Sequence, residues 1–340
     1  MHRLLARSQV FSAALGLLLL LTSSAALAQY KLTYLTSNLP GKAKYQDTLL
    51  QNAWGLAYTP DNPFWVSDEA SGWSTLYTGT GQPQSLQVIV PTANGTGFGT
   101  PTGIVASPST TDFKIDTWPS VFLFATLDGS IQGWSSFNPD STLVGAVNAG
   151  ASYTGLAITN KTSGNSLFAA DAANNKVDIY DSTFALTGSF TDSTIPAGFA
   201  PFGIQDINGQ VYVSYAATSG ASGGYIDIFT ETGTFVKRFT QGAPLNQPWG
   251  FAVAPKNFGT LSNTLLISNN ATAGTINAYN LTTGKLVGTM KNSAGKALTI
   301  NGLWALEFGG GSANNGNKNQ LFFTAGPNDT DGYFGVIAYK

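Results

Sequence analysis

Cysteine is absent from the sequence, histidine occurs once, at His2, and charged residues make up only 10% of the 340 positions. The lack of cysteine excludes disulfides, cysteine nucleophiles and thiolate metal sites. If His2 cannot take part, a histidine-based serine triad and zinc, copper or haem held by histidine are excluded as well. Few kinds of catalytic chemistry therefore remain for this chain.

His2 lies in a segment with the pattern of a secretory signal peptide. Two arginines give the segment a positive start, an apolar run follows at residues 10–21, and Ala26-Leu27-Ala28 matches a small-x-small cleavage site. We expect cleavage after Ala28, which leaves residues 29–340 as one mature domain without histidine. The apolar run is shorter than the roughly 20 residues that cross a bilayer. We therefore expect a secreted protein, periplasmic or extracellular, with no transmembrane segment.

Charge is also scarce in the expected mature chain, where acids outnumber bases. Arg3 and Arg7 fall in the signal, so 14 of the 16 basic residues remain against 18 acids, for a net charge of about −4. Arg238 is then the single arginine. Nucleic acids require a basic surface for their phosphates, so we expect no nucleic-acid partner.

Aromatic residues, which make up 12% of the chain, mark a repeat that returns about every 50 residues. Each copy is a small or β-branched residue, usually a polar residue, a small or apolar residue and then an aromatic residue, in the alternation typical of a β-strand. A period near 50 with this alternation predicts an all-β fold, a six-bladed β-propeller of four-stranded antiparallel blades. The six copies are residues 74–77, 131–134, 177–180, 226–229, 276–279 and 336–339.

Two further strands precede each copy. The middle strand is apolar, as in residues 64–68 and 211–215, and the inner strand ahead of it carries Gly or Ala at one position in every repeat. Inner strands crowd round the axis of a propeller, where a side chain at this position would collide with the next strand. The small residues at this position are Gly55, Gly103, Gly155, Gly203, Gly250 and Ala305.

A fourth, outer strand follows in five repeats, as at residues 235–239 and 286–290, but the sixth repeat reaches Lys340 without one. Residues 30–35 alternate like a strand and belong to no repeat. We therefore predict that this N-terminal strand pairs with the last blade. Such pairing closes the ring, covers an open strand edge and stands in for the missing disulfides.

Residues 167–181 resemble an NHL-type propeller repeat, and over residues 30–336 the chain is similar to an uncharacterised family of secreted bacterial six-bladed propellers. The similarity rests on runs such as Asn52-Ala53-Trp54-Gly55-Leu56-Ala57 and Pro244-Leu245-Asn246-Gln247-Pro248-Trp249-Gly250. This resemblance implies the fold and export, but no activity. Related propellers bind proteins or glycans, or act as calcium-dependent lactonases and hydrolases.

The loops that join the second and third strands open on the face where propellers usually bind ligands, around the mouth of the central channel. They carry acids and amides, among them Asp68, Asp171 and Asn269. Oxygen-rich loops of this kind suit a polar ligand or a hard cation such as Ca²⁺. Asp and Asn also cap their own backbone at strand ends, so turn chemistry is the alternative explanation.

The sharpest local motif on this face is the segment from Gly326 to Gly332. Within it, Asn328, Asp329 and Asp331 have the spacing of half a calcium loop. A complete loop ends in a bidentate Glu, and no acid follows Asp331, so Ca²⁺ would need further ligands from other blades. We regard these three residues as candidate metal ligands, with an ordinary tight turn as the alternative.

Trp54, Trp249 and Trp304 share one position of the inner strand, and Phe202 takes that position in a fourth blade. Near a channel mouth, these rings would form a stacking platform for a sugar or an aromatic ligand. Packing between blades is the alternative explanation.

The same inner-strand position bears on catalysis. Similar six-bladed lactonases hold Ca²⁺ with acids or amides there, whereas this chain has aromatic residues and threonines, so that ligand set is missing. Quinone-dependent propeller dehydrogenases typically need a catalytic histidine, which the mature chain lacks. Two carboxylates could still act as acid and base, for example Asp68 with Asp171 or Asp329 with Asp331. We expect a non-catalytic monomeric scaffold for a protein, glycan or cell-envelope ligand, and a calcium-dependent hydrolase or lactonase on the same face is the alternative.

Overall fold

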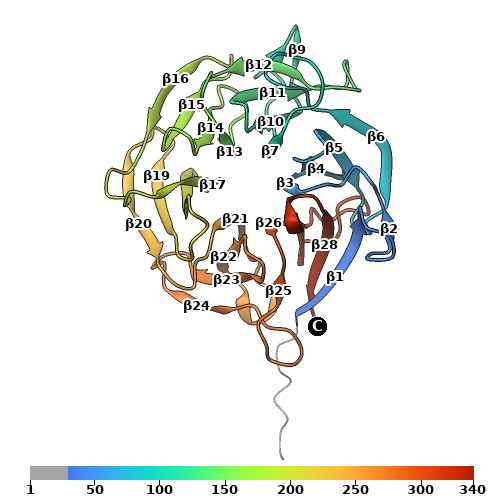
Figure 1. Ribbon diagram of the computed structural model, residues 1–340, viewed down its shortest axis with the longest axis vertical. Coiled ribbons are helices and arrows are strands. Elements are labelled where there is room, and N and C mark those ends of the chain that lie inside the picture. The colour runs from blue at the N-terminus through green and yellow to red at the C-terminus, as the bar shows by residue number, and fades with distance from the viewer. Residues whose placement is uncertain (1–29) are drawn as a thin grey trace, which may run out of the picture.

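A computed structural model describes residues 30–340 and shows six blades set round a central axis (Figure 1). Each blade is an antiparallel sheet, apart from one short parallel pairing at the outer edge of the sixth blade, and in five blades the strands follow chain order from the axis outward. The all-β, six-bladed propeller predicted from the repeat is therefore confirmed. The signal peptide predicted for residues 1–28 lies outside the described residues.

The strands of each blade are given from the axis outward. Blade 1 contains β3 (Ala53–Ala57), β4 (Phe64–Asp68), β5 (Trp73–Tyr77) and β6 (Pro83–Ile89). Blade 2 contains β7 (Pro101–Ala106), β10 (Phe122–Thr126), β11 (Ser130–Trp134) and β12 (Leu143–Val147). Blade 3 contains β13 (Tyr153–Ile158), β14 (Leu167–Asp171), β15 (Lys176–Tyr180) and β16 (Leu186–Phe190). Blade 4 contains β17 (Phe199–Ile207), β18 (Gln210–Ala217), β19 (Tyr225–Thr230) and β20 (Phe235–Gln241). Blade 5 contains β21 (Pro248–Val253), β22 (Thr264–Asn269), β23 (Gly274–Asn280) and β24 (Leu286–Thr289). Blade 6 contains β26 (Leu303–Phe308), β27 (Gln320–Ala325), β28 (Tyr333–Tyr339), β1 (Tyr30–Ser37) and β2 (Tyr45–Gln46).

Five short elements lie outside this repeat and were not predicted from the sequence. A hairpin of β8 (Lys114–Ile115) and β9 (Trp118–Pro119) is inserted into blade 2, and β25 (Thr299–Ile300) adds to β23. Two 3₁₀ turns, η1 (Gly259–Leu261) and η2 (Pro327–Asp329), complete the set. No helix within residues 30–340 has the length and apolar character needed to cross a membrane.

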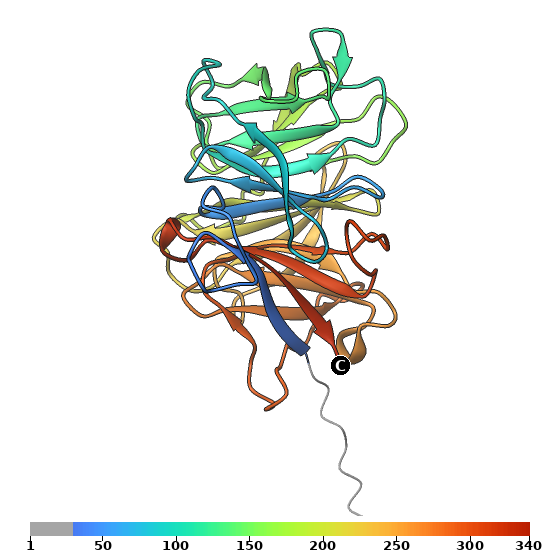
Figure 2. The ribbon, with the colours of Figure 1, turned by 90° about the vertical axis from the view of Figure 1, so that its right-hand side faces the viewer.

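The N-terminal strand closes the ring, as predicted. Figures 1 and 2 show β1, in blue, beside β28, in red, and the two strands pair antiparallel from Tyr30 opposite Tyr339 to Ser37 opposite Tyr333. The Tyr30 hydroxyl also donates to the carbonyl of Phe258 at 2.6 Å and accepts from the N–H of Leu261 at 3.0 Å. Strand β1 is therefore tied to blade 5 as well as to blade 6.

The inner strands approach one another so closely that the predicted small residues are required. A Cβ on Gly55 would lie 2.5 Å from the carbonyl oxygen of Thr102 in the next blade, and one on Gly250 would lie 2.5 Å from that of Trp304. Both distances are far below van der Waals contact. Any larger residue would push neighbouring blades apart at the axis.

Neighbouring blades are also joined by a repeated hydroxyl group that donates to a backbone carbonyl of the next inner strand. Where the inner strand carries an aromatic residue, the hydroxyl comes from the second strand. Where the second strand has Ala125 or Ala170, a threonine on the inner strand supplies it instead. This exchange explains why two blades have threonine at the aromatic position. The bonds run from Ser214 to Pro248 (2.7 Å), Ser268 to Trp304 (2.6 Å), Thr324 to Trp54 (2.5 Å), Thr102 to Tyr153 (2.6 Å) and Thr154 to Phe202 (2.8 Å).

Blade 1 departs from this pattern at a pair of buried serines. Ser67 stands where the other second-strand hydroxyls stand, and Ser74 is directly opposite it on β5. Both side chains are fully buried, and neither hydroxyl has a hydrogen-bond partner among the described residues. The other five blades place a buried apolar residue where blade 1 has Ser74. These residues are Ile131, Val177, Ile226, Ile276 and Phe334.

We expect Ser74→Val to raise the free energy of unfolding by about 1 kcal/mol, because it removes a buried hydroxyl without a partner and adds apolar area. Ser74→Ala removes the hydroxyl without adding volume and separates this gain from any overpacking. Chemical denaturation measures both variants, with Ser189→Val on the exposed part of β16 as the control. A loss of stability in both Ser74 variants would show that the hydroxyl is needed.

Candidate functional site

One end of the central channel is filled by aromatic rings from four inner strands. Trp54 stacks on Trp304 with ring centroids 3.7 Å apart, and Trp249 meets Trp304 edge-on at 5.6 Å. Phe202 lies 5.5 Å from Trp304 and 6.3 Å from Trp54. Trp54 and Trp249 are each only 8% exposed, and Trp304 is 3% exposed. These four residues form an aromatic plug across the axis.

Hydrogen bonds fix two of the indoles of the aromatic plug. The Nε1 of Trp249 donates to the carbonyl of Thr154 across the channel at 2.9 Å, and that of Trp304 donates to Oδ1 of Asn52 at 3.2 Å. The rings therefore pack between neighbouring blades, which was the alternative considered from the sequence, and Phe202 also reaches Trp54 and Trp304 across the axis. Their role in ligand binding stays a prediction.

Asp68, Asp171 and Asn269 lie in three different blades, and each bonds to its own surroundings. Asp68 is fully buried and accepts from the Thr75 hydroxyl at 2.7 Å. Asp171 accepts from the backbone and side chain of Asn174 in the following turn. Asn269 accepts from a backbone N–H at 2.9 Å and donates to a backbone carbonyl at 2.8 Å. Of these contacts, only those of Asp171 lie within its own strand-end turn, since Asp68 bonds to β5 and Asn269 bonds to the loop before β21, and a ligand role for the three residues stays a prediction.

Burial of the Asp68 carboxyl lowers the stability of the fold, because a buried polar group without full hydrogen bonding is unfavourable. Burial, with the nearby charge of Asp47 as a smaller cause, raises its pKa well above the usual range, and only the Thr75 bonds oppose the shift. Its Oδ1 has no partner within residues 30–340. The raised pKa favours the neutral form of the Asp68 carboxyl, whereas a metal ligand acts as the carboxylate.

Asn328, Asp329 and Asp331 lie in and just after η2, on the side of the ring where the inner strands begin. Asn328 and Asp329 have positive φ angles of 59° and 57°, and Nδ2 of Asn328 donates to Oδ2 of Asp331 at 3.3 Å. Within the described part of the chain, no three His, Cys, Asp or Glu residues gather as a metal-binding group. A calcium site at these residues stays a prediction.

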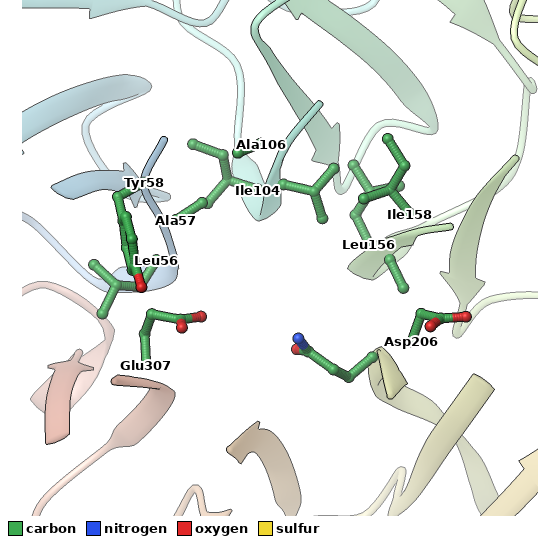
Figure 3. Close-up of a pocket in the computed structure, with 12 residues that line it drawn as sticks. Leu56, Ala57, Tyr58, Ile104, Ala106, Leu156, Ile158, Asp206 and Glu307 are labelled. Carbon is green, nitrogen blue, oxygen red and sulfur yellow. The ribbon is translucent and has the colours of Figure 1, made fainter. Parts of the chain in front are cut away.

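A hollow on the axis lies at the other end of the channel, where the inner strands end. It has a volume of about 320 Å³ and is walled by the ends of β3, β7, β13, β17 and β26 (Figure 3). A narrow extension of about 40 Å³ leads toward the aromatic plug, and a groove of about 610 Å³ leads outward under blades 4 and 5. Gln205 and Glu307 line all three spaces. We call this hollow the channel-end pocket.

Glu307 is the unusual group of the channel-end pocket. Its side chain is partly buried, and Figure 3 shows its carboxyl directed into the opening. The walls around it are mainly aliphatic, with Leu56, Ile104 and Leu156 among them. No ion pair of the described chain includes Glu307, and no side chain donates to it. Burial raises the pKa of Glu307 to about 8, and the backbone N–H of Phe308 lowers it only in part.

Tyr58 flanks Glu307 on the same side of the opening (Figure 3). Burial and, to a smaller extent, the charge of Glu307 raise the pKa of Tyr58 to about 12. Its ring is supported edge-on by Phe64 at 5.1 Å. Gly310 leaves room for this ring, because a Cβ there would lie 2.7 Å from Cε2 of Tyr58. The pocket thus presents an aromatic ring beside a carboxyl.

Sequence reasoning placed the candidate site on the opposite face and did not consider Tyr58, Gln205 and Glu307, which line the channel-end pocket. A signal was present in the repeats. The inner-strand position three residues after the aromatic or threonine holds Ala or Val in four blades, but Gln205 and Glu307 in the other two. Packing alone does not require a polar or charged residue at one position of an otherwise apolar strand repeat, so such a residue indicates a candidate functional site.

Comparison with known proteins places the chain among viral relatives. No protein-family model matches it. The chain is 30% identical over 344 residues to Uncharacterized protein R648 of Acanthamoeba polyphaga mimivirus, covering 92% of this chain and 81% of that protein. It belongs to the R648 family. Uncharacterized protein L690 of the same virus is similar to it as well, at 28% identity over 92% of this chain and 86% of L690. These viral relatives give no support to the bacterial origin implied by the sequence resemblance.

Solved structures similar to this R648-family chain are propellers of diverse activity. They include a gluconolactonase from Xanthomonas campestris (TM-score 0.55, 14% identity, 86% of this chain and 88% of that one). A streptogramin B lyase (TM-score 0.54, 14% identity) is covered over its full length by 94% of this chain. Hydrazine synthase of Kuenenia stuttgartiensis has a TM-score of 0.54 at 11% identity, over 84% and 76% of the two chains. At these identities the similarity concerns the fold alone.

Proposed function

We propose that this protein is a non-catalytic binding protein whose ligand occupies the channel-end pocket. The observation that carries the proposal is the pocket itself, a hollow of about 320 Å³ with aliphatic walls and a few polar groups at its mouth. Ligand sites have this character, and about 300 Å³ is the lower end of their usual size. We place the site here rather than on the opposite face because the aromatic plug fills the channel there.

Binding is favoured over hydrolysis by the groups that line the pocket. A calcium-dependent hydrolase requires several oxygen ligands round one point. Glu307 and Asp206 are the only carboxylates among the residues lining the channel-end pocket, and each comes from a different blade. The aliphatic walls instead suit the body of a small ligand, and Glu307, Tyr58 and Gln205 can orient its polar end.

The test is a calorimetric titration with three small probes, n-butylammonium, 1-pentanol and methyl β-glucoside. We expect at least one of them to bind the wild-type protein. Ala106→Trp, at the partly exposed rim of the pocket, should abolish this binding because the indole fills the hollow. Ala294→Trp, in an exposed turn far from the pocket, is the control and should bind normally. Binding that survives in Ala106→Trp would place the ligand elsewhere.

A further inference from the structure

The carboxyl of Glu307 lacks the partner that buried acids normally have. Five ion pairs occur within residues 30–340, and none of them reaches Glu307. Lys161 is the one basic residue that lines the channel-end pocket or its groove, and its ammonium group is held by Glu231 at 2.9 Å. Buried or partly buried charges in proteins are usually paired. Glu307 instead has a raised pKa, and its carboxyl is open to a cationic group that enters the pocket from outside.

The surroundings of Glu307 define what this group can be. The Tyr58 ring beside the carboxyl offers its π face to a cation, as in sites that recognise ammonium groups. The aliphatic walls formed by Leu56, Ile104 and Leu156 accept an apolar stem. A bulky or highly charged cation would not place an apolar stem against these walls. A primary ammonium on a short aliphatic chain matches both the carboxyl beside the Tyr58 ring and the aliphatic walls.

The charges along the outward groove also favour a cation. Asp206 and Glu231 line the groove together with Glu307, against Lys161 alone. Oδ1 of Asp206 accepts from the N–H of Gly209 at 3.1 Å, while Oδ2 is buried with no partner among the described residues. Glu231 and Lys161 pair with each other, so the negative potential of the groove comes from Asp206 and from Glu307 once it ionises, and it attracts cations toward the channel.

We propose that the channel-end pocket binds a primary ammonium group on a short aliphatic stem, with the ammonium between the Glu307 carboxylate and the Tyr58 ring. This inference rests on the proposed function, since it names the ligand class of the same pocket. A free alkylamine and a lysine side chain share this chemistry, and the experiment separates these two sources.

Binding of an ammonium group should depend on pH in a defined direction. The pKa of Glu307 is about 8, so the carboxyl is mostly neutral at pH 7 and must lose its proton to pair with the cation. Affinity should therefore rise roughly tenfold between pH 7 and pH 9, where amines of this type are still protonated.

The other titratable groups around the pocket do not reverse this direction. Tyr58 has a pKa of about 12 and remains neutral over this range. Burial and the charge of Glu231 raise the pKa of Asp206, whereas Lys161 and the N–H of Gly209 lower it. Any ionisation of Asp206 on raising the pH adds negative charge near the groove and strengthens cation binding further.

The experiment is a calorimetric titration of the folded protein with n-butylammonium, Nα-acetyl-lysine N-methylamide and the neutral analogue 1-pentanol, at pH 7 and pH 9. We expect butylammonium to bind more tightly than pentanol. Glu307→Gln should weaken its binding by about tenfold or more and remove the pH dependence. Glu69→Gln, the matched substitution on the opposite face, should keep wild-type affinity. Binding of the lysine derivative identifies a lysine side chain as a source, and its exclusion identifies a free amine.

Two other outcomes separate this inference from the proposed function. If pentanol binds as tightly as butylammonium, and both bind Glu307→Gln as well as wild type, the pocket binds ligands but the ammonium assignment is wrong. If butylammonium, pentanol and methyl β-glucoside all fail to bind, or if Ala106→Trp leaves binding unchanged, the pocket itself is wrong as the ligand site. Thermal denaturation of Glu307→Gln in the same buffers shows that the variant is folded.

Discussion

Deletion of residues 30–37 is expected to abolish stable folding of the propeller. Strand β1 covers the whole length of β28, from Tyr30 opposite Tyr339 to Ser37 opposite Tyr333. Without β1, the backbone groups along that edge of β28 lose their partners. Unpaired edges of this kind also promote association between molecules. We expect a loss of several kcal/mol in the free energy of unfolding, and aggregation of whatever material is produced.

A point substitution tests the same closure in a protein that still folds. Tyr30→Phe leaves the carbonyl of Phe258 and the N–H of Leu261 without their side-chain partner in a buried place, which costs about 1–3 kcal/mol. Lys31→Ala, on the exposed face of the same strand, should change stability by less than about 0.5 kcal/mol. Urea denaturation measures both. If Tyr30→Phe is as stable as Lys31→Ala, the anchor to blade 5 contributes little to closure.

Trp304→Ala should cost about 3–5 kcal/mol, because it removes the central ring of the aromatic plug and leaves a cavity at the axis. Trp304 stacks on Trp54, contacts Trp249 and Phe202, and is 3% exposed. Because the four rings come from blades 1, 4, 5 and 6, its loss weakens contacts across the ring and not only between neighbours. Denaturant-induced unfolding measures the effect.

Trp118→Ala is the matched control for this substitution. Trp118 is 44% exposed on the β8–β9 hairpin and stacks on Phe137, which is 62% exposed. Removing it should cost less than about 1 kcal/mol. Trp304→Phe should recover part of the loss, since it keeps a ring at the axis but gives up the bond to Asn52. Equal losses for Trp304→Ala and Trp118→Ala would contradict a structural role for the plug.

The sequence predicted the blades and their closure because those features follow from short-range patterns. The alternation of polar and apolar residues, a repeat period near 50 and one unassigned strand at residues 30–35 were sufficient to predict a closed ring of blades. The hairpin at β8–β9 was missed because two-residue strands carry no periodicity. Gly55 and its equivalents were interpreted correctly, because only close approach of inner strands explains a small residue in every blade.

The candidate site was harder to predict because its position depends on which end of the channel the side chains fill. The repeat placed Trp54, Trp249 and Trp304 near one mouth but did not show that their rings meet across the axis. Because these rings fill one end of the channel, the open space lies at the other end of the channel, where Glu307 interrupts the apolar pattern of its strand. The role of Asp68 and Asp171 stays open between ligand and turn residue, because an acid at a strand end has the same sequence pattern in a turn and in a binding site.

Because β1 closes the ring against the last strand, the chain could begin and end at a different blade and still form the same ring. Tyr30 and Tyr339 are direct neighbours, so a short linker could join the two ends of the described chain. The chain could then be cut at an exposed loop such as residues 161–164 in blade 3, which would become the blade assembled from both ends. A circular permutant of this kind would retain the plug and the channel-end pocket, since both are formed by the ring and not by either terminus.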